Sequence, residues 1–379
     1  MEAMLRLSEH LKERPLQLKK AKDGGVKIIG CTPGGYMPEE LLEAAGAIPV
    51  GLIRGGDPEP VAISGAYIPR FIDTFCRSQI GYYVSGESIL YKMMDLLVSA
   101  VTDANIKAIA DCFDFYTDVP VYRMGIPHGK TDLGYDYYLE GLGIFKKRIE
   151  DFTGNRVENS VLKEKIELYN RMRELLEEIG DLRKQDNPPI SGRDFMKLNH
   201  ATFVGDSVTM VDILEDLVKE LKTADGTGRK GPRIMLTGST MADGDSKIYD
   251  LIEETGASVV IEEFAEGLRH YWQRVNPNGD LLDALADRYF RRRVPPPFFR
   301  PSRERLDFVV ELAKDFKADG VIWYQLLYRD CYDLETFYFP KILQEGAGLN
   351  FLKIQSDYDA AETGPMRTRV ETYIQSLNH

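Results

Sequence analysis

Four cysteines are the residues of this sequence with the widest choice of chemistry: Cys31, Cys76, Cys112 and Cys331. No two of them form a CxxC pair, which argues against a zinc site and against a ferredoxin-like cluster, because both need closely spaced ligands. A nucleophilic cysteine would need a histidine base, and nothing in the sequence links any of the five histidines to a cysteine. Two interpretations stay open: four buried thiols that act as small hydrophobic residues, or an iron–sulfur cluster whose ligands are brought together by the fold.

Two acidic residues, Glu39 and Glu40, stand at the predicted start of a helix and close in sequence to Cys31. Acidic residues in a first turn stabilise a helix through its dipole, and this is the simpler interpretation. The alternative is that one of them deprotonates or orients a substrate, with Glu39 as the candidate catalytic residue. Just before them, Gly34 and Gly35 either form a tight turn or allow the backbone to approach a ligand closely.

Composition and charge narrow the class of protein. The 379 residues carry 48 basic and 60 acidic side chains, a formal net charge of −12. This balance argues against broad nucleic-acid binding, which depends on cations that neutralise phosphates. The first twenty residues are charged and amphipathic, unlike a secretory signal, and no stretch of about 18 apolar residues could span a membrane. We therefore expect a cytoplasmic protein with reduced thiols, with no nucleic acid and no membrane among its partners.

The elements that position these residues follow a regular order in the first half of the chain. An apolar run at residues 26–29 precedes a Gly- and Pro-rich turn, a helix that ends near Gly46, and a second apolar run at 47–50. This β-loop-α-β order predicts parallel strands in a covered sheet. Further strands are predicted at residues 108–110 and 119–123, and helices at 2–20, 134–180, 194–203 and 207–222.

Strands and helices alternate more regularly after a polar stretch at residues 223–232. Strands are predicted at 234–236, 258–261, 320–324 and 351–354, with helices near 247–255, 281–292, 302–317, 333–345 and 365–377. We therefore predict an α/β fold with two Rossmann-like or flavodoxin-like domains, parallel sheets and additional helices. Residues 1–190 would form the first domain with its N-terminal helix, 191–230 a helical connection, and 231–379 the second domain.

The cysteines fall near the predicted strand ends, where parallel sheets bind their ligands. Cys31 follows the first strand, Cys112 follows residues 108–110, and Cys331 follows the strand at 321–327. Cys76 lies in a loop or at a helix start. Thiols that only fill a core would more often lie inside strands, so this placement favours a functional interpretation.

Several stretches together resemble the 2-hydroxyacyl-CoA dehydratase and benzoyl-CoA reductase family, in particular its beta-type, D-component-like subunits. Residues 30–52, GCTPGGYMPEELLEAAGAIPVGL, look like the N-terminal signature of that family, and FCRS at 75–78 looks like its first cluster cysteine. The sequence DCFD at 111–114 stands where members carry a Cys-Asp pair. Residues 319–335, DGVIWYQLLYRDCYDLE, are similar to the apolar strand that ends in Cys-Asp-Pro, although Tyr332 follows Cys331 here. Residues 354–377 resemble the closing segment.

The resemblance implies a site and a cofactor. One 4Fe-4S cluster would be held by three cysteines of the first and second domains, Cys76, Cys112 and Cys331, each on a loop. Cys31 would lie in the substrate loop without binding iron. Three thiolates on four irons leave one iron free to act as a Lewis acid toward a substrate oxygen. The substrate loop would contribute Gly34, Gly35 and Tyr36, with Glu39 as the candidate catalytic residue.

The resemblance also implies an activity and partners. An ATP-hydrolysing activator protein that carries its own cluster would supply one low-potential electron, which converts an acyl-CoA thioester into a ketyl radical anion. The expected reaction is 2-hydroxyacyl-CoA dehydration. A benzoyl-CoA-type reductase, a non-catalytic electron-relay subunit and an iron-free α/β binding module are the alternatives. A homologous second subunit is expected, in a heterodimer or, alternatively, a homodimer.

A group of arginines, Arg288, Arg291, Arg292 and Arg293, has two interpretations. It could meet the phosphates of CoA or a partner subunit, or it could form the solvated face of a helix. The loop at residues 237–240 lacks the GxxxxGK[ST] and GxGxxG patterns, so no nucleotide site is predicted in this chain. ATP would bind to the activator.

Overall fold

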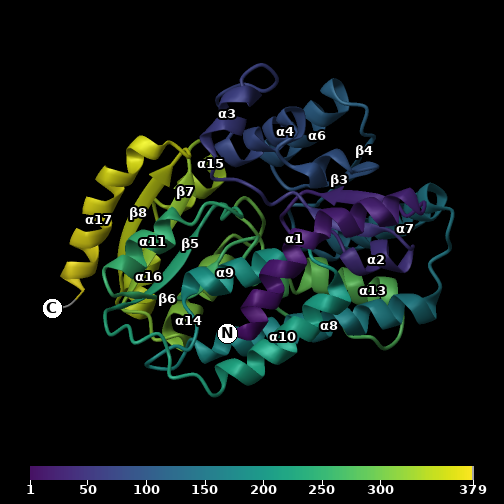
Figure 1. The fold of residues 1–379 in the computed structure, drawn as a ribbon. Helices are drawn as coiled ribbons and strands as arrows, with labels where there is room; N and C mark the ends of the chain where they lie inside the picture. The colour runs from purple at the N-terminus through teal and green to yellow at the C-terminus, as the bar shows by residue number, and fades with distance from the viewer. Residues whose placement is uncertain (378–379) are drawn as a thin grey trace.

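Two parallel four-stranded sheets with the same strand order organise the molecule (Figure 1). The computed structural model describes residues 1–377. The first sheet has the order β2-β1-β3-β4 and the second has the order β6-β5-β7-β8. The strands are β1 (Ile28–Cys31), β2 (Ile48–Gly51), β3 (Leu96–Val101), β4 (Val121–Gly125), β5 (Arg233–Gly238), β6 (Ser258–Glu263), β7 (Gly320–Leu326) and β8 (Asn350–Ser356). The predicted α/β class with two parallel sheets is confirmed.

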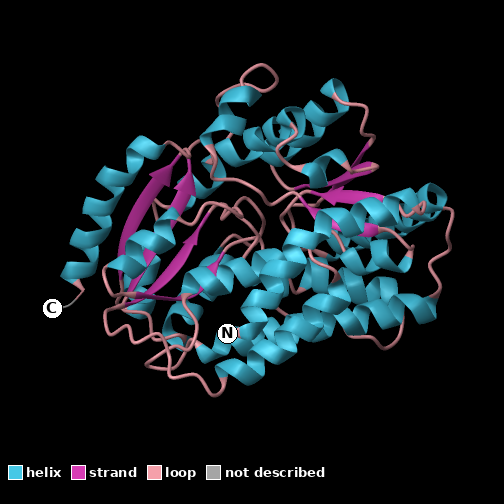
Figure 2. Cartoon of the chain, in the orientation of Figure 1, coloured by secondary structure: helices cyan, strands magenta, loops and turns pink. Residues whose placement is uncertain are grey.

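Helices cover both sheets and fill the space between them (Figure 2). Before β5 they are α1 (Glu2–Asp23), α2 (Glu39–Ala44), α3 (Pro58–Ser64), α4 (Thr74–Ser85), α5 (Ile89–Lys92), α6 (Ala104–Tyr116), α7 (Asp132–Thr153), α8 (Asn159–Leu182), α9 (Gly192–Ala201) and α10 (Ser207–Leu221). After β5 they are α11 (Lys247–Glu254), α12 (Leu268–Tyr271), α13 (Leu281–Ala286), α14 (Arg303–Asp315), α15 (Asp330–Glu335), α16 (Phe339–Ala347) and α17 (Thr363–Ser376). A π-helical turn at Asp287–Arg291 continues α13, and a 3-10 turn at Ala360–Glu362 precedes α17.

The predicted strand at residues 108–110 is wrong, because these residues belong to α6. Asp103 caps this helix, since its carboxylate accepts hydrogen bonds from the backbone N–H groups of Asn105 and Ile106. The buried positions of α6 recur with helical spacing rather than alternating. The strand that the prediction missed is β3, a short apolar run that is buried almost throughout. Cys112 therefore lies on a helix and does not follow a strand. The prediction that Cys31 follows the first strand is also wrong, because Cys31 is the last residue of β1 and pairs with Gly51 and Val98.

The remaining elements of the prediction are confirmed with small changes. The predicted helix at 134–180 is two helices, because the chain turns at Gly154 with φ 78°. The predicted helix at 333–345 is likewise divided into α15 and α16. All four strands of the second sheet lie where the alternation of apolar runs and helices predicted them.

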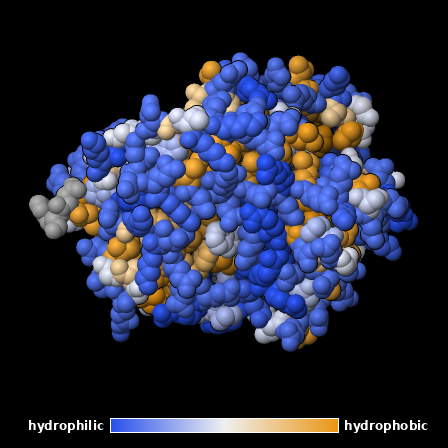
Figure 3. Space-filling model, turned by 90° about the horizontal axis from the view of Figure 1, so that it is seen from below, coloured by the Kyte–Doolittle hydropathy of each residue, from blue (hydrophilic) through white to orange (hydrophobic). Residues whose placement is uncertain are grey.

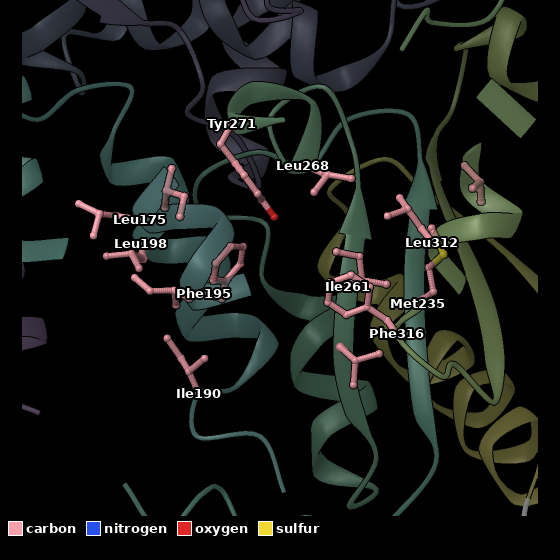
Figure 4. Close-up of a cluster of buried hydrophobic side chains, with 14 of the residues drawn as sticks. Leu175, Ile190, Phe195, Leu198, Met235, Ile261, Leu268, Tyr271, Leu312 and Phe316 are labelled. Atoms are coloured by element: carbon pink, nitrogen blue, oxygen red, sulfur yellow. The ribbon is translucent and has the colours of Figure 1, made fainter. Parts of the chain in front are cut away.

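A large hydrophobic core joins helices from the first half of the chain to the second sheet. Figure 4 shows Leu175 of α8 and Phe195 of α9 on one side of this core, and Ile261 of β6 and Met235 of β5 on the other. Conversely, Tyr289 and Phe290 from the second half of the chain pack into the core around β1 and α7 of the first half. Each half of the chain therefore contributes side chains to the core of the other.

The outer surface gives less information about function. The face seen from below is mostly hydrophilic, with scattered hydrophobic side chains (Figure 3). Among the described residues, no helix is both long enough and apolar enough to cross a membrane.

Candidate functional site

The carboxyl ends of the two sheets face each other across a narrow cavity, which we call the crevice. Its lining comes from the loops and helices that follow β1, β3, β5, β6 and β7 and from one proline of the segment before α14: Pro33, Gly34, Thr102, Asp103, Ile106, Ser239, Thr240, Ala265, Glu266, Arg269, Pro296, Arg329 and Tyr332. Ligands of open parallel sheets bind beyond the carboxyl ends of the strands. The crevice lies beyond the carboxyl ends of the strands of both sheets, so it has the position of a ligand site with respect to each sheet.

Arg329 lies beside two of the predicted cluster ligands. Its Nη1 is 3.9 Å from the Sγ of Cys76, and Cys331 follows two residues later in the first turn of α15. The guanidinium also forms ion pairs with Asp73, at 3.2 Å, and with Asp103, at 3.3 Å. Arg329 thus joins the start of α15 to the starts of α4 and α6.

The side chain of Asn105 holds the same three segments together. Its Oδ1 accepts a hydrogen bond from the backbone N–H of Asp73, just before α4, and its Nδ2 donates to the carbonyl of Tyr328, just before α15. Asn105 itself lies in the first turn of α6, the helix that carries Cys112. The structure therefore brings together the three segments that bear Cys76, Cys112 and Cys331 (Figure 1).

The three thiols are buried, and their contacts differ. Cys76 is 1% exposed, and its backbone N–H donates to the capping carboxylate of Asp73. Cys112 lies two turns along α6 from Asn105, with its Sγ 3.9 Å from the carbonyl of Tyr67. Burial raises the pKa of Cys112 and of Cys331 to about 11, and it raises the pKa of Cys76 well above its usual value. All three are therefore neutral thiols at neutral pH unless a metal replaces the proton.

This donor set fits the chemistry of an iron–sulfur cluster. Buried thiols can become thiolates when a metal binds, because the metal charge offsets their negative charge. Arg329 adds a hydrogen-bond donor beside Cys76. Within residues 1–377, no three histidine, cysteine or acidic side chains lie close enough to hold a single metal ion. A four-iron cluster is wider than one ion, so its ligands stand farther apart than those of a mononuclear site.

A second cavity, the Glu39 cavity, lies next to the crevice. It is lined by the end of β1, the loop after it, the end of β2 and the segment around the π-helical turn: Cys31, Thr32, Pro33, Gly35, Met37, Glu39, Gly51, Phe203, His270, Arg288, Tyr289 and Arg293. Pro33 lines both cavities, so a single loop separates them. Gly51 also lines an open cleft of about 540 Å³.

The two adjacent glutamates have different surroundings. Glu40 is fully buried and binds Arg173 at 2.6 Å and the hydroxyl of Tyr289 at 2.7 Å. Burial is the largest influence and would raise the pKa of Glu40, but Arg173, Arg288 and the hydrogen bond from Tyr289 together outweigh it, so the pKa lies below its usual value. Glu39 lines the cavity, and burial together with the nearby Glu40 raises its pKa to about 8. Glu40 is therefore an ionised structural residue, and Glu39 is a carboxylic acid at neutral pH.

The predicted substrate loop is held by an arginine. Arg293 donates from Nη2 to the carbonyl of Gly34 and from Nη1 to the carbonyl of Arg269, at 2.9 Å. A Cβ on Gly35 would lie 2.2 Å from the Arg293 guanidinium, so glycine is required for this close approach. Tyr36 is buried, with the guanidinium of Arg293 over its ring and its own carbonyl bound by the hydroxyl of Tyr138.

Sequence reasoning did not find several residues of the site. His270 stacks on Phe203 with ring centroids 3.9 Å apart, and burial lowers its pKa well below the usual value, so it is neutral. Asp73 and Asp103 could have been found as acidic N-caps immediately before helical segments. Arg329 gave no such signal, because its role depends on acids that lie more than 200 residues earlier.

Comparison with known proteins gives the family. Residues 35–377 match the family model described as 2-hydroxyglutaryl-CoA dehydratase, D-component. The chain belongs to this family. The D-component match therefore covers the predicted substrate loop from Gly35 onward, the segments that bear Cys76, Cys112 and Cys331, and every strand of the two sheets except β1.

Curated relatives of this D-component chain align over nearly their whole length. YjiM of Escherichia coli (strain K12), described as a dehydratase subunit, is 26% identical over 369 residues, which cover 96% of this chain and 94% of YjiM. The (R)-phenyllactyl-CoA dehydratase beta subunit of Clostridium sporogenes is 24% identical over 364 residues, 95% and 94% of the two chains. A benzoyl-CoA reductase subunit of Thauera aromatica is 22% identical over 372 residues, 94% and 92%. The relatives thus include a subunit of a CoA-thioester dehydratase and a subunit of a CoA-thioester reductase.

Proposed function

We propose that this chain is the cluster-binding subunit of an activator-dependent radical enzyme that dehydrates a 2-hydroxyacyl-CoA. Cys76, Cys112 and Cys331 would hold one 4Fe-4S cluster, and a homologous subunit would complete the enzyme. Membership of the D-component family supports the substrate class. The observation that carries the cluster assignment is the meeting of the three cysteine-bearing segments around Asn105 and Arg329.

The residues around the thiols suit such a cofactor. When bound, the cluster supplies low-potential electrons and one iron that can polarise the thioester oxygen as a Lewis acid. Arg329, whose Nη1 lies 3.9 Å from the Sγ of Cys76, would donate a hydrogen bond to that thiolate in surroundings from which water is largely excluded. The activator protein would deliver the electron at the expense of ATP.

In this proposal the Glu39 cavity handles protons. Glu39 holds its proton at neutral pH, so its carboxyl group can donate a hydrogen bond or a proton to a ligand and take one back. The neighbouring loop, with Gly34, Gly35 and Tyr36, lies between this carboxyl group and the crevice and would position the acyl group.

Iron analysis tests the cluster assignment. The chain would be purified without oxygen, its iron and sulfide quantified, and the reduced protein examined by EPR. We expect about four iron atoms per chain, and loss of most of this iron in Cys76→Ala, Cys112→Ala and Cys331→Ala. Cys31→Ala is the matched control and should keep its iron. Normal iron content in the three variants would remove the proposal, provided that circular dichroism shows them folded.

Turnover then distinguishes the candidate reactions. Benzoyl-CoA-type reduction is the second candidate, because a benzoyl-CoA reductase subunit aligns over almost the whole chain. With activator and ATP, a dehydratase should convert many 2-hydroxyacyl-CoA molecules per electron, since the electron is returned. A reductase should consume electrons stoichiometrically with product. A relay subunit would contain iron but bind no acyl-CoA in calorimetry.

A further inference from the structure

Two buried arginines of the Glu39 cavity have no acidic partner within the described residues. Arg288 is 3% exposed and donates only to main-chain carbonyls, those of Gln273, His270 and Trp272. Arg293 is 5% exposed and donates only to the carbonyls of Gly34 and Arg269. Its Nε has no hydrogen-bond partner at all in the part of the chain that the structure describes.

The other buried arginines of this region are neutralised by the chain itself. Arg173 pairs with Glu40, Arg269 with Glu263, Arg305 with Glu263 and Glu335, and Arg329 with Asp73 and Asp103. A buried guanidinium without an anion is unfavourable, because the low dielectric of the interior penalises an uncompensated charge. Two such groups lining one cavity indicate that the missing negative charge comes from a ligand.

Glu39 does not supply this charge. Within residues 1–377 its carboxyl forms no ion pair and no hydrogen bond with Arg288 or Arg293, although it lines the same cavity. His270 is also neutral, so it brings no positive charge that would change the balance. The cavity therefore has an excess of positive charge and one carboxylic acid that can donate a hydrogen bond.

The shape of the cavity limits what can enter. Its free space is about 20 Å³, close to what one water molecule needs, so it accepts an end group of few atoms. The cavity adjoins the crevice at Pro33 and the cleft of about 540 Å³ at Gly51. A larger ligand can therefore place only its end group beside the arginines.

We propose that Arg288 and Arg293 bind the carboxylate end group of a ligand in the Glu39 cavity. A planar carboxylate matches the geometry of guanidinium donors, and Glu39 can donate a further hydrogen bond to it. The site needs no cluster. That the carboxylate belongs to the acyl group of a CoA thioester is the part that rests on the proposed function.

Calorimetric titration of the full chain tests the site. The probes are glutarate, its neutral analogue glutaramide, and inorganic phosphate. We expect glutarate to bind and glutaramide to bind at least about tenfold more weakly, because only the former carries the charge. Equal binding of glutarate and glutaramide would overturn the proposal. Tighter binding of phosphate than of glutarate would also overturn it, in favour of a phosphate site.

Matched variants assign the binding to the two arginines. Arg288→Gln should weaken glutarate binding at least about tenfold. Arg291→Gln, an exposed arginine of the same helical turn that stacks on Tyr135, should leave it unchanged. An equal loss in both variants would contradict the assignment. If Arg288→Gln does not fold, Arg288→Lys keeps the charge, and glutarate should then raise the melting temperature of Arg288→Lys and of the unaltered chain, while glutaramide raises neither.

Two further arms separate this proposal from the proposed function. If the carboxylate is carried on an acyl group, glutaryl-CoA should bind more tightly than CoA. If the carboxylate belongs to a free acid, glutarate should bind and glutaryl-CoA should bind no more tightly than CoA. The Cys76→Ala variant should bind glutarate normally even though it has lost its iron. Loss of dehydratase activity therefore does not remove the carboxylate site, and loss of glutarate binding does not remove the cluster.

Discussion

The crevice and the Glu39 cavity lie on two sides of one loop, and they use arginine in opposite ways. In the crevice, Arg329 is bound by Asp73 and Asp103, so its charge is cancelled by the chain itself. In the Glu39 cavity, Arg288 and Arg293 contact only carbonyl oxygens among the described residues. Arg329 therefore holds segments of the chain together, whereas Arg288 and Arg293 remain available to a ligand.

The largest effect is expected from removing the paired arginine. Arg329→Leu leaves two acids without their cation, and breaking a buried ion pair costs about 3–5 kcal/mol. Urea unfolding followed by circular dichroism measures the loss. Arg123 is the control, because it also bridges two aspartates, Asp111 and Asp114, but at the surface. Arg123→Leu should cost less than about 1 kcal/mol, and similar losses in both variants would contradict the role given to Arg329.

A smaller effect is expected at Glu40. Glu40→Gln removes the charge that binds Arg173 and accepts from Tyr289, and hydrogen bonds to charged groups contribute about 1.5–3 kcal/mol. Glu39→Gln at the neighbouring position should not lower the free energy of unfolding at neutral pH, since the folded protein keeps Glu39 uncharged there. If Glu39→Gln is the more destabilising change, the two glutamates have been assigned the wrong roles.

The loop between the cavities allows a finer comparison. Both Gly34 and Gly35 have positive φ, 124° and 67°, so alanine at either position strains the backbone by about 1–3 kcal/mol. Only alanine at position 35 would also displace Arg293. Thermal unfolding should therefore show a loss for both Gly34→Ala and Gly35→Ala, whereas glutarate titration should show weaker binding only in Gly35→Ala. Equal affinities would mean that the position of Arg293 does not matter for the ligand.

The smallest effect is a pH dependence due to Glu39. Its pKa rises from 4.5 in the unfolded chain to about 8 in the folded protein. Between these values the unfolded chain has released a proton that the folded protein keeps, so stability falls as pH rises through this window. Because Glu39 is partly open to solvent, screening keeps the effect modest. Unfolding free energies measured from pH 5 to 8 should decline more steeply for the unaltered chain than for Glu39→Gln; parallel curves would show that Glu39 is ionised.

The sequence was sufficient for the second sheet because each of its strands is an apolar run bounded by polar turns. In the first half, residues 108–110 misled the prediction, since a short apolar run fits a strand and a helix equally well. The RYFRRR stretch at residues 288–293 shows why the site could not be predicted in full from the sequence. Its arginines look alike in sequence, yet Arg291 lies on the surface while Arg288 and Arg293 are buried. Only packing against distant elements decides which side of the turn faces the cavity.

The shared strand order of the two sheets has a consequence for folding kinetics. Each sheet is complete within one continuous stretch, residues 28–125 and 233–356, so its strands can pair before the other sheet forms. The contact of Asp103 with Arg329 joins residues 226 positions apart and depends on both sheets. We therefore expect this contact to form after the folding transition state, so that a substitution of Arg329 speeds unfolding and leaves the folding rate almost unchanged.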